Sequence, residues 1–374
     1  MADVAYTILI DDVPASLDLL DVIQEIEIED HAEMADMMRM SVAIAVKDGC
    51  VGWTVIDDNT FQRLTKIRVS VNVGSGSTEP LIEAYVTEAN ADFANRPGQS
   101  ILNIVAMEPT VLMNLLEDVK DWPNMADSDI AEAIFNNYQF TPVVDQTQPS
   151  WQENDYVTMQ RGTDIQFLQA LANRNGFECY VELNPDSGDV EGHFHLPQLQ
   201  QTPQGVLSVN MGDATNVNSF SARFDSLGPT TAKAANIDVD SQDHQHSDAD
   251  QQALTDLGET PSLPTTNPRQ VLLSGTGMST TGELLTVAQA EVDRSSWAIT
   301  AEGEVNTVAY GDVLRAKRPV LVRGAGPQFS GTYYVQSVTH TINGDGYKQR
   351  FSLKRNALGL TGTEPFAAIT AQST

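Results

Sequence analysis

Strict alternation of apolar and polar residues runs through the first 110 positions and constrains the fold more than any other feature. It is clearest in residues 22–29, 40–46 and 67–73, where for example Ile26 and Ile28 share one face. A repeat of two places successive side chains on opposite faces of a strand, so each run predicts a strand with one buried face. Six short strands with polar connections predict a small antiparallel barrel or sandwich. The remaining three runs are residues 4–10, 81–88 and 100–107.

Helical spacing replaces this alternation after residue 109. Apolar residues in 110–120 and 127–138 recur at helical intervals and predict two helices. A third helix has the best-defined ends, because Thr163 and Gln166 match a capping box and Gly176 matches a C-terminal stop. A strand at 177–183 and a return strand through His193 and Leu196 complete an α+β module.

Strand character returns in the second half of the chain, where a polar tract interrupts it. Residues 205–211 and 217–224 read as strands, and residues 228–282 as an insertion that is either partly ordered or a mobile loop, with a short strand at 271–273. A helix is predicted at 282–297. Further strands follow to residue 354, including a hairpin whose turn, Asn343 to Gly346, contains the Asn-Gly pair typical of tight hairpins.

The predicted fold class is therefore α+β and mainly β, with two related small antiparallel β-barrels and an α+β module. The second barrel is split by an insertion. The predicted boundaries are a first barrel at 1–109, the α+β module at 110–204, the second barrel at 205–227 and 298–356, an inserted polar tract plus helix at 228–297, and a C-terminal tail at 357–374.

Composition excludes several classes of function. The net charge of −30 argues against direct nucleic-acid binding, which needs an excess of Lys and Arg to neutralise phosphates. No apolar run reaches the length of a membrane-spanning helix, so stable membrane insertion is not expected. The first residues lack the features of a signal peptide, which predicts folding in the cytoplasm. Cys50 and Cys179 are too few for a structural zinc site, and both are interpreted as buried thiols.

The acidity itself has two interpretations. In the first, a negative surface keeps a large assembly soluble or lines a channel. In the second, the acidity reflects a saline habitat in which charge repulsion is screened.

Two histidine pairs are weak candidates for metal ligation. His193 and His195 lie two apart on a predicted strand, so both imidazoles face the same side. His244 and His246 lie in an acidic tract. The alternative interpretations are an exposed polar face for the first pair and a solvated loop for the second. The sequence contains no recognised catalytic motif and no cofactor-binding motif, so neither an enzyme nor a cofactor is predicted.

A cluster of basic residues stands out in this acidic chain. Between residues 314 and 355 Asp345 is the only acid, and the bases are Arg315, Lys317, Arg318, Arg323, Lys348, Arg350, Lys354 and Arg355. A basic patch of this kind either docks onto an acidic partner or a second copy of the chain, or protects an exposed strand edge from unwanted pairing.

Three segments together resemble the phage late control protein D family of tail baseplate hub proteins, which is related to the hub part of type VI secretion spike proteins. The first segment is residues 160–177, with Phe167-Leu168 in the helix and an Arg-x-Gly-aromatic exit. The second is the helix at 128–138. The third is residues 329–340, where a Ser-Gly-x-Tyr turn precedes a strand that ends in His340, followed by 346–351.

The resemblance implies a structural role. Three subunits with two barrels each would form a ring of six, matching a hexameric tail tube to a trimeric spike, with the first barrel facing the tube. Expected partners are two further copies in a homotrimer, the tail tube protein, the spike protein and other baseplate proteins. The protein would be made in a bacterial or archaeal cytoplasm and assembled into a virion tail or an injection-particle baseplate. Because the sequence has no long Val-Gly-rich β-helix, the spike is expected to be another chain.

Two alternatives remain open at this stage. A cell-wall hydrolase carried on a tail would require a catalytic constellation, and a carbohydrate-binding tail-fibre module would require exposed aromatic platforms.

Overall fold

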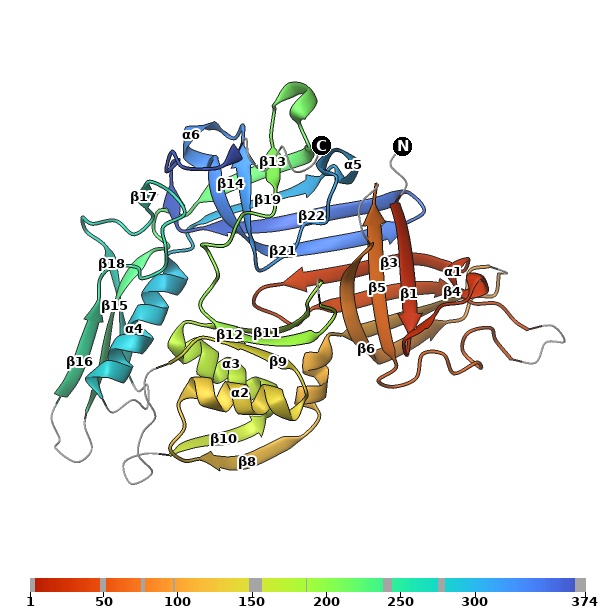
Figure 1. Cartoon of the computed structure of the whole chain (residues 1–374), viewed down its shortest axis with the longest axis horizontal. Helices are drawn as coiled ribbons and strands as arrows, with labels where there is room; N and C mark the ends of the chain where they lie inside the picture. The colour runs from red at the N-terminus through yellow and green to blue at the C-terminus, as the bar shows by residue number, and fades with distance from the viewer. Residues whose placement is uncertain are drawn as a thin grey trace.

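The computed structural model describes residues 4–47, 52–74, 78–96, 98–147, 157–185, 187–237, 244–274 and 280–366. Figure 1 shows two β regions that meet side by side, an α+β module below them, and the insertion at the left. Of the two thiols that were expected to be buried, Cys50 lies outside the described residues, and Cys179 is a half-buried free thiol.

One large sheet runs through both β regions. Its principal strand order is β14-β19-β22-β21-β3-β4-β7-β6-β5-β1-β2, and β20 pairs with β21 and with β13. The first region contains β1 (Val4–Ile10), β2 (Val13–Pro14), α1 (Leu17–Leu20), β3 (Ile23–His31), β4 (Met37–Ala43), β5 (Lys66–Val73), β6 (Thr78–Asp92) and β7 (Ile101–Met107). The six strands predicted there are thus confirmed.

The second region contains the remaining strands of this sheet. They are β13 (Val206–Ser208), β14 (Val217–Phe224), β19 (Ile299–Val305), β20 (Pro319–Arg323), β21 (Gly331–Asn343) and β22 (Gly346–Arg355), with the short helices η2 (Gly212–Ala214), α5 (Thr307–Tyr310) and α6 (Gly326–Phe329) between them. The predicted hairpin is confirmed, because β21 and β22 pair up to the register Asn343↔Gly346.

The two β regions are joined by direct strand pairing. β21 pairs antiparallel with β3 from Ser337↔His31 to Asn343↔Glu25. Separate apolar cores lie on either side of this joint, one around Ile26, Met40 and Val69 and the other around Val320 and Tyr333. The mainly β class with antiparallel sheets and a few helices is confirmed, while closure of either region into a barrel stays a prediction.

The α+β module is built from η1 (Pro109–Asn114), β8 (Glu117–Trp122), α2 (Asp127–Asn137), β9 (Thr141–Val144), β10 (Thr158–Thr163), α3 (Asp164–Asn175), β11 (Glu178–Leu183) and β12 (Val190–His195). The predicted capping box is present, since Thr163 accepts from the backbone of Gln166, and Gly176 ends α3 with a φ of 71°. β12 pairs with β11 and with β9 to form a small sheet.

The helix predicted at 110–120 is wrong. A short 3-10 helix ends at Asn114, and strand β8 follows and pairs with β10. Leu116 and Val119, two of the apolar residues whose spacing predicted this helix, are 80% and 72% exposed. The apolar spacing was helical, but the residues pack as a two-stranded ribbon instead.

The described residues of the tract at 228–282 form a folded unit, as the alternative of a partly ordered insertion predicted. β15 (Thr230–Ile237) pairs with β16 (His244–Ala249) and in parallel with β18 (Arg269–Ser274), which confirms the short strand at 271–273. The predicted helix is α4 (Thr281–Ser295), and it packs on this sheet around Ala232, Ala234 and Leu284. β17 (Thr260–Pro261) pairs with β23 (Ala357–Leu358), so the start of the predicted tail is paired as well.

None of the helices in the described part of the chain is long and apolar enough to cross a membrane.

Candidate functional site

A buried cluster of charges lies where the first β region, the second β region and the α+β module meet. At its centre the ammonium of Lys317 lies 2.7 Å from Asp30 Oδ1 and 2.9 Å from Asp36 Oδ2. Asp30 belongs to β3, Asp36 precedes β4, and Lys317 precedes β20. We call this set, with the neighbouring Arg315 and Arg318, the ionic junction.

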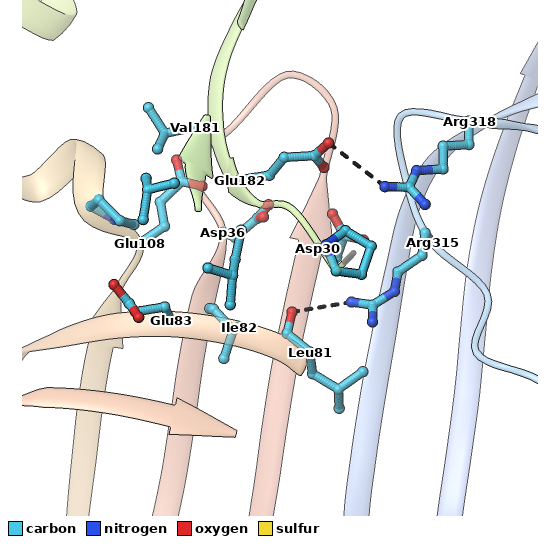
Figure 2. Close-up of a pocket in the computed structure, with 14 residues that line it drawn as sticks. Asp30, Asp36, Leu81, Ile82, Glu83, Glu108, Val181, Glu182, Arg315 and Arg318 are labelled. Atoms are coloured by element: carbon cyan, nitrogen blue, oxygen red, sulfur yellow. Dashed lines mark hydrogen bonds and ion pairs between the residues drawn. The ribbon is translucent and has the colours of Figure 1, made fainter. Parts of the chain in front are cut away.

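The two arginines of the ionic junction connect the second β region to the other two units (Figure 2). Arg315 donates to the backbone oxygen of Pro80 at 2.5 Å. It also donates to the backbone oxygen of Leu81 at 3.3 Å, as Figure 2 shows, and both residues lie on β6. Arg318 lies 3.7 Å from Glu182 Oε1 on β11. The segment 315–318 is therefore held by two units of the fold, because Arg315 and Lys317 contact the first β region and Arg318 contacts the α+β module.

Burial and charge act against each other on these groups. Burial opposes ionisation of Asp30, but the charge of Lys317 and its hydrogen bond lower the pKa of Asp30 to about 2. Burial raises the pKa of Asp36 to about 7, although Lys317 opposes that shift. Burial also raises the pKa of Glu108, which lies beside Asp36, well above its ordinary value. Asp30 is therefore held ionised, whereas Asp36 and Glu108 beside it bind a proton at a higher pH than ordinary carboxyl groups do.

A second buried base connects the same three units. Lys354 on β22 lies 2.8 Å from Glu33 Oε1 in the β3–β4 connection and 3.8 Å from Glu178 Oε1 on β11. Tyr334 donates to Glu178 Oε2 at 2.5 Å. Burial raises the pKa of Glu178. Lys354 therefore neutralises buried acids and is not available at the surface.

The other basic residues of the predicted patch are spread over different environments. Arg355 is fully buried and donates to the backbone oxygens of Leu257 and Ser330. Arg323 is half-buried and donates to Ser208. Lys348 and Arg350 are exposed, and Arg350 lies 3.3 Å from Glu304 Oε2. The eight residues do not form one continuous surface patch, because Lys317, Lys354 and Arg355 lie in the interior.

His193 and His195 are brought together, but in the interior rather than on an exposed face. Their side chains are buried, with His193 Nδ1 3.0 Å from His195 Nε2. His195 Nδ1 lies 2.8 Å from the backbone oxygen of Leu196. Burial lowers the pKa of His193 to about 3. Glu182 and Glu191 place carboxylate oxygens 3.6 and 3.3 Å from His193 Nε2.

The other histidines of the second half of the chain lie in two different environments. His244 and His246 lie exposed on β16, and neither belongs to a potential metal cluster in the part of the chain that the structure describes. His340, which ends the strand in the third segment of the family resemblance, is fully buried, and its Nδ1 lies 2.7 Å from the hydroxyl of Tyr347.

The acids of the ionic junction were missed by the sequence analysis, although one signal was present. Asp30 follows Ile26 and Ile28 on the same face of the strand, so the alternation itself places it inward. On β11, Glu178, Tyr180 and Glu182 likewise share the face directed at the junction. An acid in a buried position of an alternating run predicts a buried cation, but the pattern does not say which one.

Comparisons with known proteins agree on the fold. The tail protein from Neisseria meningitidis superposes with a TM-score of 0.66 at 11% identity, covering 94% of this chain and 97% of that one. The 43 kDa tail protein of prophage MuSo2 from Shewanella oneidensis gives 0.64 at 14% identity, covering 94% and 98%. An E. coli component of the type VI secretion system, described as structurally similar to T4 bacteriophage tail proteins, gives 0.58 at 9% identity, covering 93% and 76%.

These likenesses confirm the expected resemblance at the level of fold: the chain has the fold of phage tail proteins and of a type VI secretion system component. The curated proteins include no match to the sequence. A family model described as the Alg8 N-terminal domain matches residues 12–344. The chain therefore belongs to the Alg8 N-terminal domain family.

Proposed function

We propose that the protein is the structural baseplate hub of a phage tail or of a phage-tail-like contractile injection system. Three copies would form a ring that presents a hexameric arrangement of β regions to the tail tube and a threefold arrangement to the spike. Its partners would be the tube protein, the spike protein and other baseplate proteins, in a particle assembled from subunits made in the cytoplasm.

The observation that carries this proposal is the β21–β3 joint. Because the two β regions share one sheet, their relative orientation is fixed by backbone hydrogen bonds within a single subunit. A symmetry adaptor requires this rigidity, since three subunits can imitate six equivalent positions only when both regions of each subunit keep a constant relation. The fold shared with phage tail proteins supports the same role.

The ionic junction supports the proposal in a second way. Lys317 and Lys354 each neutralise acids from other units of the fold, so the α+β module is tied to both β regions at once. Buried ion pairs contribute little net stability but specify geometry, because a shifted arrangement leaves a charge unpaired in the interior. We infer that the junction sets the orientation of the module.

We further propose that the protein acts by assembly and not by catalysis. Buried ionisable groups with shifted pKa values, such as Asp30, Asp36 and Lys317, lie between structural units and are paired with one another. A buried ion-pair network that joins structural units perturbs pKa values without requiring chemistry.

The docking surface in this proposal is reduced to Lys348 and Arg350 on β22, the exposed remainder of the predicted basic cluster. β22 is two strands away from β14, the strand at which the described order of the sheet ends. The edge of β14 can pair with a neighbouring copy, as exposed strand edges do.

The test is the mass of the purified chain in solution, measured by light scattering at moderate and high salt, alone and with the spike protein. A trimer in either mixture supports the hub. Electron-microscopy averages of that species should show a ring with six peripheral densities. A monomer under every condition, including with the spike protein, would overturn the proposal.

A further inference from the structure

A cation site that no comparison assigns lies on the face of the small sheet directed at the ionic junction. Glu182 on β11 is directly opposite Glu191 on β12, and His193 is two residues further along β12. Their ligand atoms all lie within 4.8 Å of one another. Like charges directly opposite one another destabilise a strand pair, so this arrangement calls for a cation between them.

The hydrogen bonds fix which nitrogen of His193 is free. The backbone oxygen of Leu196 can only accept, so His195 Nδ1 carries the proton of that bond. In neutral His195, Nε2 is then an acceptor, and His193 Nδ1 must donate to it across 3.0 Å. Neutral His193 is left with a lone pair on Nε2.

That lone pair is directed at negative charge. His193 Nε2 has no hydrogen-bond partner, although only 7% of the side chain is exposed. Its neighbours are Glu191 Oε2 at 3.3 Å and Glu182 Oε1 at 3.6 Å. A lone pair and two carboxylates repel one another unless a cation lies between them.

The spacing matches a single ion. Two atoms bound at about 2.0–2.2 Å to one tetrahedral ion lie roughly 3.3–3.6 Å apart, which matches the separations of His193 Nε2 from Glu191 and Glu182. A metal-bound histidine ordinarily donates its other ring N–H to a neighbouring acceptor, which His195 provides. Asn184 holds the other oxygen of Glu191 at 2.8 Å, leaving Oε2 toward His193.

We propose that Glu182, Glu191 and His193 bind a divalent transition-metal ion, with zinc as the best fit to one imidazole and two carboxylates. Arg318 lies 3.7 Å from Glu182 and neutralises part of the negative charge of the two carboxylates. The bound ion would neutralise the rest. The ion would cross-link β11 to β12 beside the ionic junction. This inference does not depend on the hub proposal.

The experiment uses the full chain without an affinity tag. Zinc content is measured by elemental analysis after dialysis against zinc, and thermal unfolding is followed with added Zn²⁺, Mn²⁺ or Mg²⁺. We expect about one tightly bound zinc per chain and a melting temperature that rises with zinc concentration, because a ligand that binds only the folded state stabilises it. Mg²⁺, which prefers oxygen ligands and octahedral geometry, should have little effect.

Two variants distinguish this site from surface binding. Glu191→Gln keeps the shape and removes one charged ligand, and it should weaken zinc binding at least about tenfold. The double variant His244→Gln/His246→Gln removes the exposed pair on β16 and should bind zinc like the wild type.

Cobalt binding can be measured on the wild-type chain alone, so this test does not depend on whether the variants fold. Co²⁺ in the wild-type chain should give the visible absorption bands of a low-coordinate site, and zinc should remove them. Substoichiometric zinc with no thermal shift would overturn the proposal. Such a result would indicate that a proton on His193 neutralises the carboxylates. Zinc binding that survives in E191Q and is lost in the histidine double variant would overturn it equally.

Discussion

Lys317 and Asp36 are separated by 281 positions in the sequence, yet their side chains form a buried ion pair at 2.9 Å. Asp30, on strand β3, contacts the same ammonium at 2.7 Å. Lys317→Met would leave both acids without their cation in the interior. We expect this change to lower the free energy of unfolding by about 3–5 kcal/mol, as for other broken buried pairs. Urea denaturation at neutral pH measures it.

Two further variants test the cause of that loss. Lys317→Met combined with Asp30→Asn and Asp36→Asn removes the unpaired charges and should recover much of the lost stability. Lys233→Met breaks an exposed pair with Asp248 and should change stability by less than about 0.5 kcal/mol. A Lys317→Met protein as stable as the wild type would mean that the ion pairs of Lys317 do not contribute to the free energy of unfolding.

Protonation of His340 should couple stability to pH. Burial lowers the pKa of His340 to about 3, so the folded state holds it neutral while the unfolded chain protonates it below its ordinary value of 6.5. The contribution of neutral His340 to the free energy of unfolding is therefore present above pH 6.5 and is lost as the pH falls towards 3. At about pH 5 the loss should reach about 2 kcal/mol relative to neutral pH.

The comparison for this prediction is His340→Gln, studied by urea denaturation at about pH 7.5 and about pH 5. Asp36, whose pKa is raised to about 7 by burial, acts in the opposite direction, because its contribution is lost as the pH rises. Only the difference between wild type and variant isolates the histidine. Equal pH slopes for the two proteins would show that His340 does not titrate in this range.

Charge reversal at two of the bases on β22, Arg350 and Lys354, should have different consequences. Arg350 is exposed, so Arg350→Glu should leave the free energy of unfolding within about 0.5 kcal/mol and weaken trimer formation. Lys354 contacts two acids in the interior, so Lys354→Glu should cost more than about 3 kcal/mol and prevent folding at physiological temperature.

Light scattering and thermal unfolding of each variant separate assembly from folding. Arg269→Glu, at an exposed position on β18 of the insertion, is the matched control and should assemble normally. Normal assembly by Arg350→Glu would remove this surface from the proposed interface.

Gly192 is required for space and not for backbone conformation. A Cβ at this position of β12 would overlap the ring of Phe135, which is fully buried in the core of the α+β module. Gly192→Ala should destabilise the chain by about 1–3 kcal/mol, as overpacked cores do. Adding Phe135→Leu should restore part of the stability. An additive loss in the double variant, seen in the same denaturation assay, would contradict the steric explanation.

Local signals predicted much of this fold. The alternating runs gave the strands of the first region because their faces differ sharply in polarity, as at Ile26 and Ile28. Helix α3 was predicted closely because Thr163, Gln166 and Gly176 satisfy the backbone groups at its two ends by local contacts. Such features depend on neighbours in the sequence and so are visible there.

Features that depend on distant partners were not predictable in this way. Apolar residues at 110–120 have helical spacing, but β8 forms because β10 offers a pairing edge. The insertion looked polar because its core is built largely from small residues, among them Ala232, Ala234 and Ala249, with few larger ones. Lys317 and Lys354 looked like surface charge until the acids that enclose them were placed.

The β21–β3 joint also determines how the molecule carries mechanical load. A pull along the strands that separates the two β regions would shear the whole paired length from Ser337↔His31 to Asn343↔Glu25 together, because antiparallel hydrogen bonds lie perpendicular to the strands. A pull across the strands would open the same pairs one after another from an end. A subunit placed with its shared strands along the axis of thrust would therefore resist force in one direction and yield more readily in the other.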